Sequence, residues 1–122
     1  MEVENSSLPA GSLKISQDVV ASIARFAAME VDDVVAVSTG NTGVKGLITK
    51  TKYVKAIKIE LSEDIVNVEI SIIVRFGVKV TQVALAVQNN VKNSIQNMTG
   101  LAVAKVDVVI AGVSIKPEGN EE

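Results

Sequence analysis

Residues 57–75 read IKIELSEDIVNVEISIIVR, and the pattern of this stretch indicates the centre of the fold. Apolar and polar residues alternate on both sides of the turn Ser62-Glu63-Asp64, a period of two that is typical of β-strands with one buried face. The apolar positions are Ile57, Ile59, Leu61, Val66, Val68, Ile70, Ile72 and Val74. Because the turn is so short, the two strands are predicted to form an antiparallel hairpin.

Helical patterns lie on both sides of this hairpin. Upstream, Ser16 is placed as the N-cap of a helix that runs to about Met29. Its predicted buried face consists of Val19, Ile23, Phe26 and Ala27. Downstream, a helix of about five turns ends at Gly100. Its apolar residues at helical spacing are Val80, Val83, Ala84, Val87, Val91, Ile95 and Met98.

The remaining strands are predicted at residues 13–15, 34–37 and 101–115. The last of these follows a helix, which predicts a parallel, right-handed β-α-β unit. The element order is then β-α-β-β-β-α-β. We expect an α/β (α+β) fold, a two-layer sandwich whose mixed sheet carries two helices on one face. A chain of 122 residues accommodates one domain, predicted at 11–116, between a disordered acidic tail at 1–10 and an acidic tail at 117–122.

The amino-acid composition limits the chemistry that this protein can carry out. The chain has no cysteine and no histidine, which excludes disulfides, thiol nucleophiles and imidazole catalysis. The carboxylates, lysines and hydroxyls show no clustering, so we predict a protein that is not an enzyme, with no catalytic residue, no cofactor, no metal and no small-molecule substrate. The start lacks the pattern of a secretory signal, and no run of ~18 apolar residues occurs. The expected location is cytoplasmic.

Segment 45–58 carries the strongest charge asymmetry, with five lysines and no acidic residue. One interpretation is a contact for an anionic ligand or a partner, made by Lys45, Lys50, Lys52, Tyr53 and Lys55. The ligand would be the phosphates of nucleic acid or of anionic lipid, with Tyr53 stacking. The other interpretation is a solvated loop that leads into an edge strand protected by lysines. The isoelectric point of about 5.2 argues against general nucleic-acid binding.

Both interpretations of this segment place its lysines on the surface. Changing Lys50, Lys52 and Lys55 together to Glu is therefore expected to leave the thermal unfolding midpoint unchanged. A shift typical of core damage would contradict the surface placement. Loss of membrane association at unchanged stability would favour a binding site over a solvated loop.

Three further motifs favour structural explanations. Gly40-Asn41-Thr42-Gly43 has the G-x-x-G spacing of an RNA-binding loop, but a turn is the better interpretation because a strand precedes it. Turns are also predicted for the adjacent carboxylates Asp32-Asp33 and Glu63-Asp64, since neither pair has the spacing of a calcium loop. The second helix has an amide-rich face, which is either solvated or bonded to a partner helix or to its own copy. Its members are Gln82, Asn89, Asn93 and Asn97, with Gln88, Asn90 and Gln96 nearby.

The last strand suggests an oligomer interface. Val106, Val108 and Ile110 share one face and are expected to pack under the helices. Strict alternation places Val109, Ala111, Val113 and Ile115 together on the opposite face. Nothing in the predicted fold covers that face, and an uncovered apolar patch usually marks a protein interface. We therefore predict a homo-oligomer that uses these four residues.

The order and spacing of several short motifs resemble the bacterial alkaline shock protein family of envelope stress proteins. The resemblance covers about residues 11–115, with Asp33 standing where the family's glycine is expected. The motifs are Gly11-Ser12-Leu13-Lys14-Ile15-Ser16, Val19-Val20, Ile23-Ala24, Val74-Arg75-Phe76-Gly77, Val83-Ala84, Val87-Gln88, Val91-Lys92, Met98-Thr99-Gly100-Leu101 and Val106-Asp107-Val108.

The resemblance implies a non-enzymatic protein of mainly Gram-positive bacteria, linked to cell-envelope homeostasis and to general or alkaline stress. It implies protein–protein interaction and self-association. It also implies recruitment to the inner face of the cell membrane by an anchor partner that carries a related domain. Another branch of the family is linked to fatty-acid synthesis through acetyl-CoA carboxylase, so a regulator of that pathway is an alternative. A small nucleic-acid-binding protein that uses segment 45–58 is a second alternative.

Overall fold

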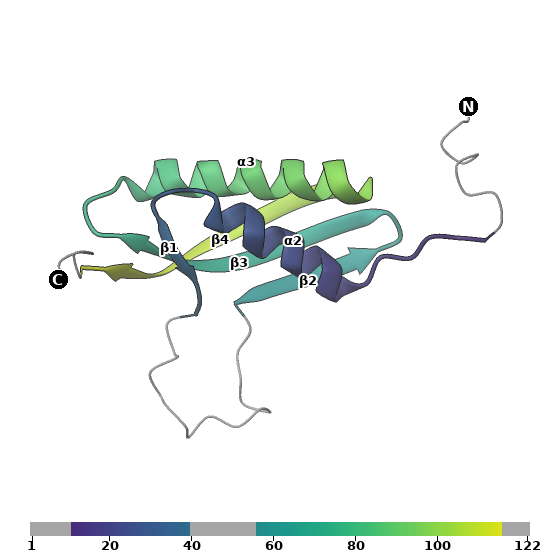
Figure 1. Ribbon diagram of the computed structural model, residues 1–122, viewed down its shortest axis with the longest axis horizontal. Helices are drawn as coiled ribbons and strands as arrows, with labels where there is room; N and C mark the ends of the chain where they lie inside the picture. The colour runs from purple at the N-terminus through teal and green to yellow at the C-terminus, as the bar shows by residue number, and fades with distance from the viewer. Residues whose placement is uncertain (1–10, 40–55, 116–122) are drawn as a thin grey trace, which may run out of the picture.

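The computed structural model describes residues 11–39 and 56–115. Two helices lie together on one face of a four-stranded sheet, which makes the predicted two-layer α+β architecture (Figure 1). The layers separate because each strand and each helix has a single apolar face to bury. The elements are α2 (Gln17–Met29), β1 (Val34–Val37), β2 (Ile57–Ser62), β3 (Ile65–Arg75), α3 (Val80–Thr99) and β4 (Ala102–Ser114).

Strand β3 is the centre of the mixed sheet. Along one of its edges β4 runs parallel for the full length of β3. The other edge is shared, because β2 pairs antiparallel with residues 65–70 and β1 pairs antiparallel with residues 72–74. The predicted hairpin and the predicted parallel β-α-β unit are therefore both confirmed.

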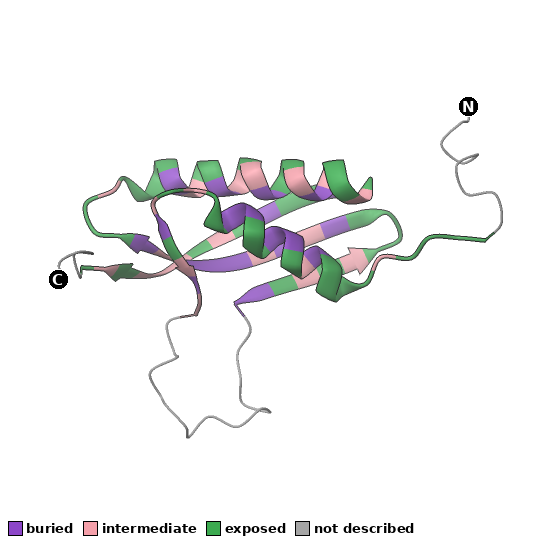
Figure 2. Cartoon of the chain, viewed as in Figure 1, coloured by how far each residue is buried: buried purple, intermediate pink, exposed green. Residues whose placement is uncertain are grey.

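The core lies between the sheet and the two helices. On β3, alternate side chains from Val66 to Val74 face the helices and are at most 2% exposed. Figure 2 shows the same separation, with the buried positions on the facing sides of the two layers. The helices contribute mostly β-branched and small side chains to this core. They are Val20, Ile23, Ala24, Ala27 and Ala28 from α2 and Val83, Val87, Val91 and Ile95 from α3.

The buried face of α2 includes the predicted Ile23 and Ala27 but not the predicted Val19 and Phe26. Val19 is 47% exposed and Phe26 is 68% exposed, whereas their neighbours Val20 and Ala27 are buried. The two possible faces differ by one residue, and hydrophobicity alone favours the one with the larger side chains. The structure instead buries the face rich in alanine, because small side chains let α2 lie close to α3. The approach is close enough for Asn90 of α3 to donate to the Ala27 carbonyl at 2.7 Å.

The first predicted strand is wrong, since residues 13–15 form no strand in the structure. Ile15 packs against the edge of the core, while Leu13 is exposed. Three residues offer few ladder hydrogen bonds, and Ser16 directs the chain into α2 by accepting a hydrogen bond from the Val19 amide at 3.2 Å. The order within the described residues is therefore α-β-β-β-α-β.

The turn between β2 and β3 contains a strained residue. Glu63 has φ of 52°, in the left-handed region where a side chain crowds the backbone. Changing Glu63 to Gly is expected to raise the free energy of unfolding by about 0.5–1 kcal/mol, because it removes a left-handed strain of about 1–2 kcal/mol, part of which is offset by the greater conformational freedom of glycine in the unfolded chain. Urea unfolding would measure the gain. Asp64→Gly in the same turn is the control, because Asp64 has no positive φ. An equal gain from Asp64→Gly would contradict the assignment of strain to Glu63.

Candidate interaction surfaces

The turn interpretation is confirmed for both adjacent carboxylate pairs, Asp32-Asp33 and Glu63-Asp64. Arg75 closes the first turn, because its guanidinium donates to the Asp32 carbonyl at 2.8 Å and its Nε lies 3.8 Å from an Asp33 carboxylate oxygen. Glu63 and Asp64 form the hairpin turn between β2 and β3. Across residues 11–39 and 56–115, no group of three or more acidic side chains is placed to hold a metal ion.

The predicted anionic-ligand residues lie outside the described residues. They are Lys45, Lys50, Lys52, Tyr53 and Lys55, and the G-x-x-G motif at 40–43 lies outside as well. Their role stays a prediction. Lys58, at the end of the same segment, is described. Its amino group lies 3.7 Å from a carboxylate oxygen of Glu69, its cross-strand neighbour on β3. Lys58 therefore takes part in an exposed cross-strand pair of the sheet.

The open face of the sheet is the face away from α2 and α3. In a ladder, paired residues point to the same face, so Lys58, Glu69 and Asp107 form one row across three strands. The next row toward the C-terminal end of β3 contains Ser71 and Val109. The following row contains Ile73 and Gly112, where a methyl group on Gly112 would come within 2.9 Å of Ile73 Cδ1. This face is therefore charged at one end and apolar at the other.

A bulge in β4 breaks the strict alternation of faces that the predicted oligomer interface assumed. Ile110 pairs with Ile72 but Gly112 pairs with Ile73, so Ala111 is an extra residue and the alternation of faces reverses there. Val109 lies on the open face, as the alternation predicts. Val113 lies level with Val74, whose side chain faces the helices. Ile115 lies beyond the strand. The four residues therefore do not share a face, whereas the predicted packing of Val106, Val108 and Ile110 against the core is confirmed.

The amides of α3 form two groups that the sequence did not distinguish. One group is exposed, and the other bonds to the backbone of β4. Gln82, Asn89, Asn93 and Asn97 are exposed, as predicted. Gln88 donates to the Val106 carbonyl at 3.0 Å, and Gln96 accepts from the Val103 amide at 3.3 Å. Both bonds satisfy backbone groups on the edge of β4 that does not pair with β3. Two amides spaced eight residues apart beside a predicted strand are the only sequence signal for this contact.

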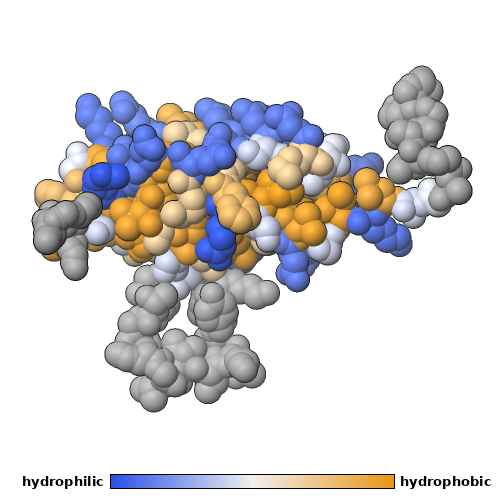
Figure 3. Space-filling view, in the orientation of Figure 1, coloured by the Kyte–Doolittle hydropathy of each residue, from blue (hydrophilic) through white to orange (hydrophobic). Residues whose placement is uncertain are grey.

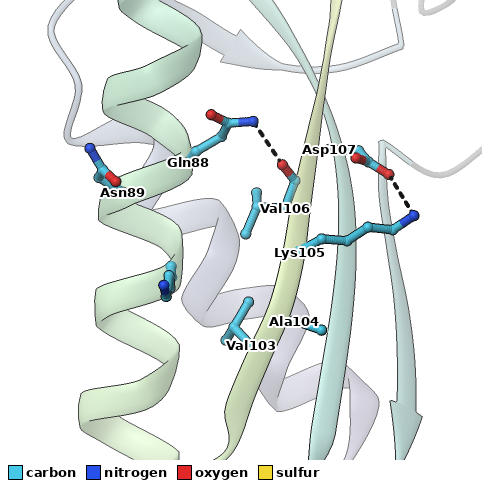
Figure 4. Close-up of a pocket in the computed structure, with 8 residues that line it drawn as sticks. Gln88, Asn89, Val103, Ala104, Lys105, Val106 and Asp107 are labelled. Carbon is cyan, nitrogen blue, oxygen red and sulfur yellow. Dashed lines mark hydrogen bonds and ion pairs between the residues drawn. The ribbon is translucent and has the colours of Figure 1, made fainter.

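A shallow groove of about 330 Å³ follows that same edge of β4, between the strand and α3. In Figure 4, Gln88 reaches from α3 to the Val106 carbonyl, while Lys105 and Asp107 lie on the other side of the strand. The Lys105 amino group lies 3.6 Å from an Asp107 carboxylate oxygen. The groove is lined by Gln88, Asn89, Lys92 and residues 103–107. It is polar and open, so it suits backbone contact better than a small apolar ligand.

A third surface is the α2 stripe, formed by Val19, Phe26 and Met29 on the outer side of α2. All three are exposed, and a spacing of seven and ten residues from Val19 places them on one side of the helix. Figure 3 shows apolar side chains over the α2 side of the molecule and hydrophilic side chains along α3. The outer side of α2 is therefore the more apolar of the two helical surfaces. Neither helix in the described ranges is both long and apolar enough to cross a membrane.

By its architecture the protein is a two-layer α+β domain with a mixed four-stranded sheet and both helices on one face. The sequence match narrows this class to one family. Residues 5–115 match the model of the alkaline shock protein 23 family, described as having a cell envelope-related function, and the chain belongs to this family. The predicted resemblance to alkaline shock proteins is confirmed. The family description names no enzymatic activity.

Relatives in Bacillus and Streptococcus support the assignment. "Uncharacterized protein YqhY" of Bacillus subtilis is 31% identical over 123 residues, covering 99% of this chain and 90% of that protein. "Uncharacterized protein YloU" of the same organism is 28% identical, covering 86% and 90%. "Uncharacterized protein Spy1614" of Streptococcus pyogenes is 23% identical, covering 88% and 92%. No solved structure gives a significant match.

Proposed function

We propose that this chain is a non-enzymatic interaction and assembly module of cell-envelope homeostasis. A membrane-anchored protein partner would hold it at the inner face of the cell membrane, where it would assemble with its own copies. The family's cell envelope-related function supports the setting. The observation that carries the proposal is the exposed α2 stripe. An apolar surface on a helix usually marks the place where a partner binds.

Phe26 is the centre of this argument. A phenylalanine that is 68% exposed leaves much of its apolar surface in water, and clustered apolar side chains on a surface usually mark an interaction site. Aromatic residues and methionine are enriched in the buried centres of interfaces. Phe26, with Val19 and Met29 beside it, therefore supplies the kind of side chains that a protein partner would bury.

Changing Phe26 to Ser is expected to release the protein from the membrane fraction of its native cells. The wild type should pellet with membranes, and the variant should move to the soluble fraction because the partner loses its main apolar contact. Immunoblotting of the two fractions measures the distribution. Met98→Ser is the matched control, because Met98 is also highly exposed but lies at the end of α3.

Stability and partner identity complete this test. Phe26→Ser should change the free energy of unfolding by no more than about 0.5 kcal/mol, as for other surface substitutions. Affinity isolation of the endogenous protein with mass spectrometry should recover a membrane-anchored protein, and less of it with the variant. A wild type found only in the soluble fraction would refute membrane recruitment. Recovery of acetyl-CoA carboxylase subunits instead would favour the role in fatty-acid synthesis.

A further inference from the structure

The outer edge of β4 is an open strand edge. Strand β4 pairs only with β3 among the described residues, and Gln88 and Gln96 satisfy one outer backbone group each, at Val106 and Val103. The slip at Ala104 lets both Val103 and Val106 point outward, and because backbone groups alternate between the two edges beyond it, those of Val108 also point outward. Natural proteins protect long edges with several charges, prolines, β-bulges or a covering element. This strand of 13 residues contains one lysine, one aspartate and no proline, and although its ladder with β3 slips at Ala104 and Ala111, residues 105–110 between the slips keep a regular register.

The groove beside α3 lies along this edge, where an added strand would run. It follows residues 103–107, and on the α3 side it is lined by Gln88, Asn89 and Lys92. Gln88 reaches from α3 to the Val106 carbonyl (Figure 4). An added strand would find backbone donors and acceptors along β4 and polar side chains above it. Strand addition of this kind obtains its affinity from main-chain hydrogen bonds.

The charges identify the strand that fits. Lys105 and Asp107 flank Val106, and both side chains lie on the open face because their partners on β3 are Asn67 and Glu69. In an antiparallel pair of two β4 strands centred on Val106, Lys105 of each copy lies opposite Asp107 of the other. Opposite charges at directly paired positions stabilise a sheet, whereas like charges destabilise it. The sequence of β4 is thus complementary to itself.

We propose that β4 pairs antiparallel with β4 of a second copy, about a two-fold axis at Val106. The two sheets then form one continuous sheet with all helices on the same face. A two-fold contact of this kind uses the same patch on both copies. Gln88 does not block it, because the Val106 carbonyl has two lone pairs and accepts a second hydrogen bond.

The amides of α3 add to the same contact. Helix α3 runs opposite to β4, since Gln96 bonds at Val103 and Gln88 bonds farther along at Val106. The axis at Val106 therefore places Gln88 and Asn89 near their own counterparts in the second copy. Side-chain amides both donate and accept, so they are suited to pairing with themselves. This inference deepens the proposed function and rests on it for self-assembly, but it requires no membrane.

Charge exchange at Lys105 and Asp107 tests the pairing in purified protein. Lys105→Asp and Asp107→Lys each place like charges opposite each other, and each should weaken the dimer at least about tenfold. Mixing the two single variants should restore a heterodimer. The double variant Lys105→Asp/Asp107→Lys should restore the homodimer. Sedimentation velocity across a concentration series measures the dissociation constant, and circular dichroism confirms that each variant is folded.

Each result decides for or against the pairing. A wild type that stays monomeric at every concentration overturns it, and shows that the two glutamines close the edge by themselves. Single variants that dimerise as tightly as the wild type overturn the axis at Val106. Weakened single variants that neither the mixture nor the double variant rescues also overturn it. Membrane release by Phe26→Ser is independent of these outcomes, so the proposed function can fail while the dimer stands.

Discussion

Changing Ile70 to Ala is expected to lower the free energy of unfolding by about 2–5 kcal/mol. Ile70 is fully buried on the helix-facing side of β3, the central strand, with Ile57 of β2 and Val108 of β4 as its neighbours across the sheet. Strands on both sides hold the backbone in place, so the site cannot collapse to fill the cavity. Denaturant unfolding followed by circular dichroism measures the loss.

Ile65→Ala is the matched control for this prediction. Ile65 begins the same strand but is 46% exposed, so its truncation removes little buried surface. We expect a loss of at most about 1 kcal/mol, because an exposed side chain contributes only part of its transfer free energy. Equal losses at the two positions would show that β3 is not the centre of the core.

Changing Ala24 to Leu is expected to cost about 1–3 kcal/mol by overpacking. Ala24 is fully buried on the face of α2 that packs against α3 and the sheet. Three added carbons have no space there, because the alanine face keeps the helices close. The substitution should also lengthen or break the hydrogen bond from Asn90 to the Ala27 carbonyl. Thermal unfolding measures the cost.

Ser22→Leu is the control on the opposite side of α2. Ser22 is exposed, and leucine is a better helix former than serine, so this change is expected to be neutral or slightly stabilising. If Ala24→Leu changed stability as little as Ser22→Leu, then α2 would not pack against the core through its alanine face. The buried face would then be the one that the sequence pattern indicated, with Val19 and Phe26 inside.

The candidate surfaces could be predicted only in part. The exposed amides of α3 and the two carboxylate turns follow from short-range patterns, and the structure confirms them. The contacts of Gln88 and Gln96 with the edge of β4 were missed. No sequence pattern indicates which backbone group a half-buried helical amide will bond to. The predicted interface on β4 assumed strict alternation, and one extra residue at Ala111 was enough to change the face of Val113.

Local sequence patterns were sufficient to predict the hairpin of β2 and β3, the length of α3 and the parallel crossover to β4. These features depend on periodicity and turn chemistry, which act over a few residues. Three features followed only from the folded chain. They are the buried face of α2, the position where the ladder of β4 slips, and the strand edge that stays open. Those outcomes depend on how closely two helices approach and on which backbone groups find partners. Both are set by residues far apart in the chain, such as Asn90 with Ala27 and Gln88 with Val106.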